Sequence, residues 1–99
     1  MTAGESRNSI QIHIRYLNIL RGAAGRKEET LSLPPEATVE TLFRTLSSRG
    51  GMKSIIYGKK GEINHLIRIC RKDTHHLLTL TDQLEDQVLY DMFVATFGG

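Results

Sequence analysis

Apolar and polar residues alternate strictly at the start of the predicted domain. Every second residue from Ile10 to Tyr16 is isoleucine or tyrosine, and the residues between them are polar or charged. A period of two predicts a strand with one face on a core. A second strand is predicted over residues 28–33, and the segment between them, which contains Gly22 and Gly25, predicts the turn of a hairpin. The two strands are therefore expected to pair.

The period changes to that of a helix after Pro34 and Pro35. Apolar residues then recur at the spacing i, i+3, i+4 and i+7, which lines one helix face: Val39, Leu42, Phe43 and Leu46. Thr38 is the predicted N-cap, because its hydroxyl can accept a hydrogen bond from a free N–H of the first turn. Gly50 and Gly51 are predicted to stop the helix. This segment therefore predicts an amphipathic helix that packs one face on the core.

Three further runs predict strands in the second half of the chain. Residues 63–70 alternate, residues 76–80 form a weaker run, and residues 88–95 form the closing strand. Two strands, a helix and then more strands predict an α+β domain, with a mixed sheet of four to five strands and one main helix across one face. The ubiquitin-like β-grasp is the natural candidate for this order. Three residues are expected to cap its core: Met52, Ile55 and Ile56.

Composition limits the chain to one small domain. It has 99 residues, of which 39% are apolar and 24% charged, and its single cysteine, Cys70, excludes an internal disulfide. The first 30 residues lack the apolar stretch of a signal peptide, so we expect a cytoplasmic protein. The net charge of +2 involves no concentrated basic tract, and no apolar run approaches the roughly 20 residues that cross a bilayer. We therefore expect neither a membrane nor a nucleic-acid partner.

The two ends of the chain have different expected roles. Residues 1–9 are small and polar and predict a flexible leader, followed by a β-grasp domain over residues 10–95. Residues 96–99 predict an extended tail that ends in Gly98 and Gly99, and glycines can lie flat in a narrow channel because they lack Cβ. The main-chain carboxylate of Gly99 is the candidate working group. The alternative is a frayed, idle terminus.

Three stretches resemble one family. Residues 12–25, 33–42 and 84–99 are similar to the opening strand, the entry to the helix and the closing strand of the small subunit of molybdopterin synthase, with Leu17 where that family has an aromatic residue. The family comprises the MoaD-like and ThiS-like ubiquitin-fold sulfur carriers. The resemblance covers residues 10–99.

The resemblance implies a sulfur carrier in molybdopterin biosynthesis or in a related pathway that makes a sulfur-containing cofactor. An adenylating enzyme of the ubiquitin-activating type would use ATP to adenylate Gly99 and convert its carboxylate to a thiocarboxylate. The sulfur would pass to a partner like the large subunit of molybdopterin synthase, or to another acceptor. This implies a carrier that acts as a small subunit, with no bound cofactor of its own, and the chain has no Gly-rich nucleotide-binding motif followed by Lys and Ser or Thr.

The ending Thr96-Phe97-Gly98-Gly99 is also similar to the ends of ubiquitin-related modifiers. These share the activation step and are joined to lysines of target proteins. A protein modifier is therefore the alternative function, and a plain interaction domain is a third.

The sheet face away from the helix is the predicted docking surface. If the first, third and last strands of a β-grasp sheet lie side by side, that face gathers eight residues: His13, Arg15, Leu17, Leu66, Arg68, Cys70, Asp91 and Phe93. Aromatic, apolar and Arg anchors usually carry most of the binding energy of an interface. The predicted partner-binding residues are Phe93, Leu17, Arg15, Arg68 and Leu66, and Phe97 is assigned to the tail with Gly98. The alternative is an ordinary half-solvated sheet face.

The remaining polar candidates have plainer interpretations. Cys70 lacks a Cys-X-X-Cys pattern and is interpreted as a structural thiol. His75 and His76 complete no metal motif and are expected in a turn or in solvent. Lys59 and Lys60 predict a solvated turn.

Overall fold

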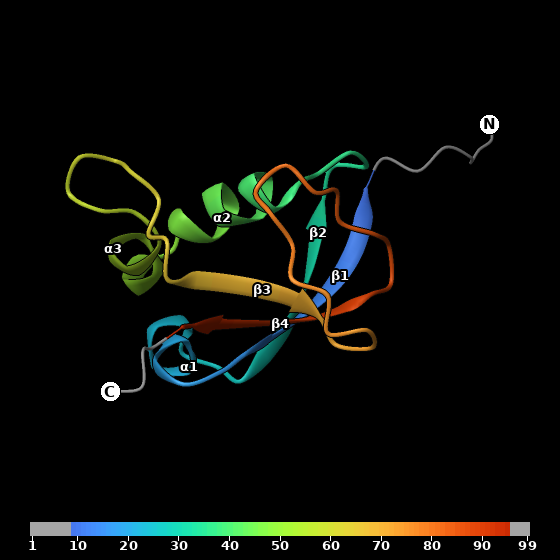
Figure 1. The fold of residues 1–99 in the computed structure, drawn as a ribbon, viewed down its shortest axis with the longest axis horizontal. Coiled ribbons are helices and arrows are strands. Elements are labelled where there is room, and N and C mark those ends of the chain that lie inside the picture. Colours follow the sequence, from blue (N-terminus) through green and yellow to red (C-terminus); the bar gives the residue numbers. More distant parts are fainter. Residues whose placement is uncertain (1–8, 96–99) are drawn as a thin grey trace.

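The computed structural model describes residues 9–95, which form one mixed sheet with its main helix across one face (Figure 1). The elements follow in the order β1 (Ile10–Tyr16), α1 (Ile19–Ala24), β2 (Glu28–Leu33), α2 (Val39–Ser47), the 3-10 turn η1 (Gly50–Met52), α3 (Lys53–Ile56), β3 (Ile67–Arg71) and β4 (Leu89–Val94). The strand order is β2-β1-β4-β3. Strand β1 runs antiparallel to β2 and parallel to β4, and β3 runs antiparallel to β4. The predicted α+β fold with a four-stranded mixed sheet is confirmed.

Helix α2 begins where the sequence predicts. The Thr38 hydroxyl accepts a hydrogen bond from the Thr41 N–H at 3.4 Å, and the Thr41 hydroxyl accepts one from the Thr38 N–H at 3.2 Å. This reciprocal capping box satisfies two backbone donors at the helix start. The helix buries the predicted apolar stripe: Val39, Leu42, Phe43 and Leu46. It ends at Ser47, three residues before Gly50.

The core lies between α2 and the inner face of the sheet. Its sheet side is formed by alternate residues of β1, β3 and β4, of which the most deeply buried are Ile12, Ile14, Tyr16, Ile69, Tyr90 and Met92. Met52 and Ile56 cover one end of the core, as predicted, and Ile55 is partly buried against it. The predicted alternation of β1 is therefore confirmed at each of its inward positions.

A buried carboxylate joins the hairpin to the end of α2. Arg49 lies 2.7 Å from Glu29 of β2, and the Tyr16 hydroxyl donates a second hydrogen bond to the same carboxylate. Burial by itself favours the protonated acid, but the hydrogen bonds from Arg49 and Tyr16 outweigh it, so the pKa of Glu29 is lowered. Burial and the same contact raise the pKa of Tyr16. The carboxylate thus works as a structural ion pair.

The predicted turn between the first two strands contains a helix, so that prediction was incomplete. Helix α1 spans six residues, too few to show a helical period, and it is anchored by the fully buried Leu20. Gly25 ends it in the left-handed conformation with φ 77°, where a glycine carries no steric penalty. The segment at residues 50–56 also contains η1 and α3, which were not predicted.

The predicted strand over residues 63–70 is too long. Strand β3 begins at Ile67, because the Asn64 side chain accepts a hydrogen bond from the Leu66 N–H at 2.9 Å and its carbonyl accepts one from the Ile67 N–H at 3.1 Å. This local turn keeps Leu66 and the residues before it out of strand β3. Ile63 instead forms an isolated bridge with Tyr57.

The predicted strand over residues 76–80 is absent from the described structure. Only Leu77 forms an isolated bridge, to Cys70. The Leu80 carbonyl accepts a hydrogen bond from the Glu40 N–H at 3.1 Å, which draws the chain away from the sheet and toward the start of α2.

The predicted leader and tail lie outside the described residues, except for Ser9, which is exposed. Within residues 9–95, none of the helices is long and apolar enough to cross a membrane.

Candidate functional site

The outer face of the sheet, opposite α2, brings together the side chains that the sequence assigned to a docking surface. In the register of the sheet, Arg15 lies opposite Asp91, Asp91 lies opposite Cys70, and Arg68 lies opposite Phe93. Side chains of neighbouring strands that lie opposite each other share a face, and every second residue of a strand returns to it. We call this surface the open face. The prediction that the first, third and last strands are neighbours is confirmed.

A charged pair occupies the middle of the open face. The Arg15 guanidinium donates two hydrogen bonds to Asp91, from Nε at 2.8 Å and from a terminal nitrogen at 3.1 Å. Asp91 is 8% exposed, and its bidentate contact with Arg15 joins β1 to β4. The hydrogen bond to Asp91 raises the pKa of Arg15. The charge of Arg15 is thus already matched within the sheet.

Cys70 packs beside this pair. It is a buried free cysteine, and burial, together with the neighbouring charge of Asp91, raises the pKa of its thiol. A raised pKa leaves the thiol protonated and weakly nucleophilic at neutral pH. The structural role predicted for Cys70 agrees with this environment.

The apolar part of the open face lies around the end of β4. The Leu17 N–H donates to the Met92 carbonyl at 3.0 Å on one side, and the Ala95 N–H donates to the Leu66 carbonyl at 2.7 Å on the other. Leu17, Leu66, Arg68 and Phe93 are all half-buried. Four of the five predicted partner-binding residues therefore surround the end of β4, whereas Arg15 lies farther along the sheet in its ion pair.

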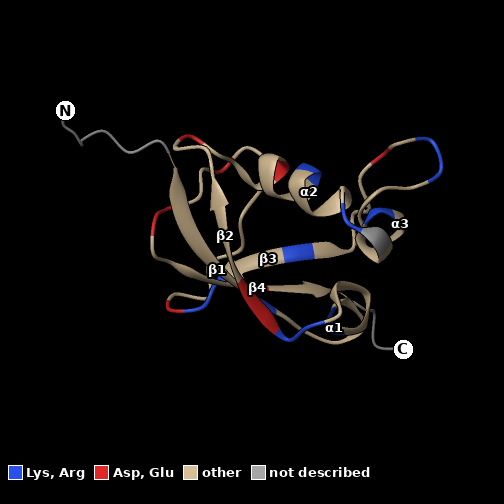
Figure 2. Cartoon of the chain, turned by 180° about the vertical axis from the view of Figure 1, so that it is seen from behind, with Lys and Arg blue, Asp and Glu red and all other residues tan. Residues whose placement is uncertain are grey.

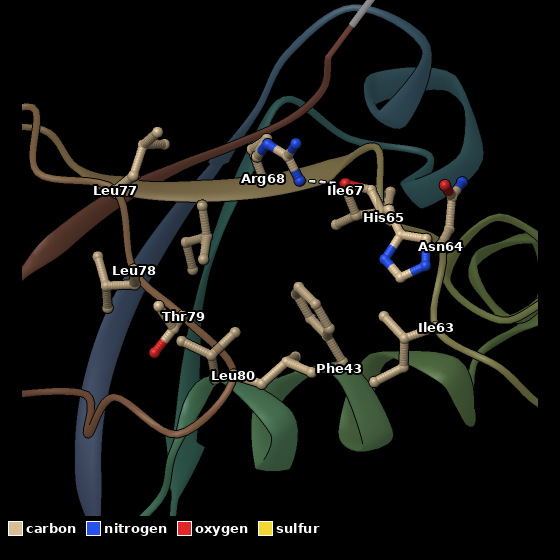
Figure 3. Close-up of a pocket in the computed structure, with 12 residues that line it drawn as sticks. Phe43, Ile63, Asn64, His65, Ile67, Arg68, Leu77, Leu78, Thr79 and Leu80 are labelled. Carbon is tan, nitrogen blue, oxygen red and sulfur yellow. Dashed lines mark hydrogen bonds between the residues drawn. The ribbon is translucent and has the colours of Figure 1, made fainter.

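Two apolar residues of the open face were not predicted from the sequence. Leu89 lies opposite His13 and shares the face of Asp91 and Phe93, so the alternation of the last strand was a sufficient signal. Leu77 is 51% exposed and pairs with Cys70 across an isolated bridge, which no local pattern predicts. In Figure 3, Leu77 and Arg68 stand on the side of β3 away from α2.

Asn18 holds the end of β4 from the side of β1. Its side-chain amide donates to the Val94 carbonyl at 3.2 Å, and its side-chain oxygen accepts from the Val94 N–H at 3.3 Å. Asn18 precedes α1, where an asparagine usually caps the helix, yet it makes no capping hydrogen bond. Its backbone lies at φ 46° and ψ −130°, a conformation unusual for a residue with a side chain. The sequence reasoning missed this clamp.

The cationic groups are unequally available. Figure 2 shows basic colouring on β3, whose sequence contains Arg68. Its guanidinium donates to the backbone carbonyl of His65, and within residues 9–95 it makes no ion pair. Arg68 can therefore offer its charge to a partner.

Solved structures share this architecture. SAMP1, the small archaeal modifier protein 1 of Haloferax volcanii, is 19% identical, with a TM-score of 0.76, over 90% of this chain and 99% of that one. The putative molybdopterin converting factor subunit 1 of Pyrococcus furiosus is 20% identical, with a TM-score of 0.68, over 89% and 100%. A Caldiarchaeum subterraneum ubiquitin is 19% identical, with a TM-score of 0.55, over 92% and 99%. The chain has the ubiquitin-like β-grasp fold.

The sequence itself matches no family model and no curated protein. The solved structures confirm the predicted resemblance to the MoaD-like family at the level of the fold. In the described part of the chain, no group of three or more His, Cys, Asp or Glu side chains is placed to hold a metal ion. His75 and His76 are exposed, and so are Lys59 and Lys60, as predicted. The tail residues Phe97, Gly98 and Gly99 lie outside the described residues.

Proposed function

We propose that this β-grasp protein is a sulfur carrier whose working group is the carboxylate of Gly99. The observation that carries the proposal is the position of β4. This strand lies between β1 and β3, its hydrogen bonds to the β3 side continue to Ala95, and only two residues of sequence separate Ala95 from Gly98. From Phe93, an extended chain to Gly99 reaches about 20 Å, at about 3.3–3.6 Å per residue. A docked sheet could therefore feed the carboxylate into a partner's active site.

The chemistry of a carboxylate explains why a partner is needed. An α-carboxyl group has a pKa of about 3.3–3.7, so Gly99 is anionic at neutral pH and a poor electrophile. We propose that an adenylating enzyme of the ubiquitin-activating type binds ATP, and that a Gly99 oxygen attacks the α-phosphorus and releases pyrophosphate. Hydrosulfide then attacks the acyl carbon and displaces AMP, which leaves the thiocarboxylate. In this proposal the protein is a carrier that supplies the carboxylate and a docking surface, in the cytoplasm where ATP is available.

The open face around the end of β4 is the proposed contact for the activating enzyme and for the sulfur acceptor. Phe93 and Leu17 offer apolar anchors, Leu66 borders them, and Arg68 offers a charge that makes no ion pair with any residue between 9 and 95. Phe93→Ala should raise the KM for the activating enzyme and leave kcat nearly unchanged, because the side chain contacts the partner and not the reacting carboxylate. Leu89→Ala is the matched control, since Leu89 shares the face but lies at the start of β4. An equal effect of the two substitutions would argue against a focused contact at the end of β4.

The structural similarity to SAMP1, a small archaeal modifier protein, supports a second candidate. A modifier would use the same adenylate, but a lysine amine would displace AMP and form an amide. The destination of the acyl group distinguishes the two functions.

The deciding experiment combines the full chain with ATP, a purified adenylating enzyme and sodium sulfide. Replacing oxygen by sulfur adds about 16 Da, nearly the same as methionine oxidation, so the change must be localised by sequencing the C-terminal peptide. A trappable thiocarboxylate at Gly99, absent from a variant that lacks Gly99, supports the carrier. Amides between Gly99 and lysine without a thiocarboxylate support the modifier. Modification that persists without Gly99 refutes both.

A further inference from the structure

A groove lies between α2 and the outer edge of β3, and two residues of the open face, Arg68 and Leu77, border it at that edge (Figure 3). Its volume is about 310 Å³, near the low end of the range of about 300–1,000 Å³ typical of ligand pockets. The groove is bounded by α2, β3 and the segments 63–65 and 77–80. Its apolar lining includes Phe43, Ile63, Leu78 and Leu80. We call it the α2–β3 groove.

Two backbone groups at the edge of β3 have no hydrogen-bond partner within residues 9–95. The Ala95 N–H donates to the Leu66 carbonyl, so the backbone groups of Leu66 and of every second residue after it point toward β4. The N–H and carbonyl groups of Ile67 and Ile69 therefore point away from β4. The Ile67 N–H donates a hydrogen bond to the Asn64 carbonyl, and the Ile69 carbonyl accepts one from the Leu78 N–H. The Ile67 carbonyl and the Ile69 N–H make no hydrogen bond to any residue between 9 and 95.

These unpaired groups are costly where they lie. Ile69 is only 1% exposed and borders the groove. A buried backbone group without a hydrogen bond costs free energy comparable to a lost bond, so such groups are nearly always paired with protein or water. The segment 76–78 is hydrogen-bonded to the edge of β3 at Arg71 and Ile69. After Leu78 the chain leaves this edge, because the Leu80 carbonyl accepts a hydrogen bond from the Glu40 N–H. The edge at Ile67–Ile69 is therefore a gap in an otherwise covered strand.

One residue of an extended peptide has the two groups that fill this gap. In parallel pairing, its N–H can donate to the Ile67 carbonyl while its own carbonyl accepts from the Ile69 N–H. The side chain of this peptide residue then lies beside Arg68, because Ile67 and Ile69 flank Arg68 in the strand. The side chains of the two neighbouring peptide residues point to the opposite face, where the apolar part of the groove lies.

Charge decides which peptide fits. Among the described residues that line the groove, Arg68 and His65 are basic or titratable, and none is acidic. Arg68 makes no ion pair within residues 9–95. We propose that the α2–β3 groove binds an extended segment of another protein in which an acidic residue stands between two apolar residues. The acidic residue pairs with Arg68, and the apolar residues enter the groove.

The test titrates the isotope-labelled full chain with a capped pentapeptide of the sequence serine-isoleucine-aspartate-isoleucine-serine. NMR should show saturable shifts of the Ile69, Leu78 and Leu80 amides, and a peptide with lysine in place of aspartate should bind about tenfold more weakly or worse. Leu80→Asp should abolish binding by placing a negative charge in the groove. Leu80 is 36% exposed, so the fold should tolerate this change. Ile19→Asp is the matched control, because Ile19 is 60% exposed and lies outside the groove.

Three results would overturn the proposal: no saturable shift, equal binding of both peptides, or shifts confined to the open face. Groove signals that depend on protein concentration, or that change when residues 1–8 are removed, would assign the groove to a second copy or to the chain's own leader, and would also overturn it. Adenylation of Gly99 does not enter this test, so its outcome is independent of the proposed carrier function.

Discussion

The clamp between Asn18 and Val94 allows the order at the end of β4 to be separated from the stability of the fold. Asn18 makes two hydrogen bonds to the backbone of Val94, and it does so at a positive φ of 46°. Three substitutions separate the effect of the hydrogen bonds from the effect of the strained backbone. Asn18→Ala removes the hydrogen bonds and keeps a side chain at positive φ. Asn18→Gly removes the hydrogen bonds and relieves the strain, and Asn18→Asp keeps an acceptor for the Val94 N–H.

The magnitudes follow from the geometry. The two bonds are long, at 3.2 and 3.3 Å, and exposed, so each should contribute about 0.5–1 kcal/mol to the free energy of unfolding. A non-glycine residue in a sparsely populated backbone region costs about 1–3 kcal/mol. Asn18→Ala should therefore destabilise the protein by about 1–2 kcal/mol, because the strain stays. Asn18→Gly should lie within about 1 kcal/mol of the parent, because the relieved strain offsets the lost bonds.

Urea unfolding and hydrogen exchange at the Val94 amide test these expectations together. Protection of Val94 should fall in the Ala and Gly variants and persist in Asn18→Asp, although only the Ala variant is clearly less stable. If Val94 stays protected in Asn18→Gly, the side chain does not hold the strand. If the Ala and Gly variants lose equal stability, the positive φ carries no strain and the reasoning fails.

Three further outcomes are expected. Thr38→Ala should lower the free energy of unfolding by about 1 kcal/mol in urea, because the capping box with Thr41 is lost; no change would contradict it. Glu29→Gln should cost about 1–3 kcal/mol at pH 7 through its bond to Arg49. The pKa of Glu29 is lowered by folding, so this contribution is present above its unfolded pKa of about 4.3 and lost as pH falls through the folded pKa; parent and variant should converge in acid, and a constant gap would refute the assignment. Native Cys70 should react slowly with iodoacetamide and fast in urea, since burial raises its pKa; fast native labelling would contradict this.

Much of the candidate site followed from local patterns. The alternation of Ile10–Tyr16 identified which side chains of β1 face outward, because a strand reverses its side chains at every residue. The same rule placed Asp91 and Phe93 on one face of the last strand. Their meeting with Arg15 and Arg68 was an inference from a β-grasp strand order, and the register confirms it.

Local patterns of residues were enough to predict the elements whose period or capping is local: β1, β2, the start and buried stripe of α2, and most of β4. Features that depend on contacts between distant residues emerged only when the chain folded. Helix α1 is too short to show a period and is held by the buried Leu20. The clamp of Asn18 on Val94, and the part of the β3 edge that no residue between 9 and 95 pairs with, each arise from segments far apart in the chain. Periodicity records which face of an element is buried, but it carries no information about which other element lies there, and that pairing created both the clamp and the groove.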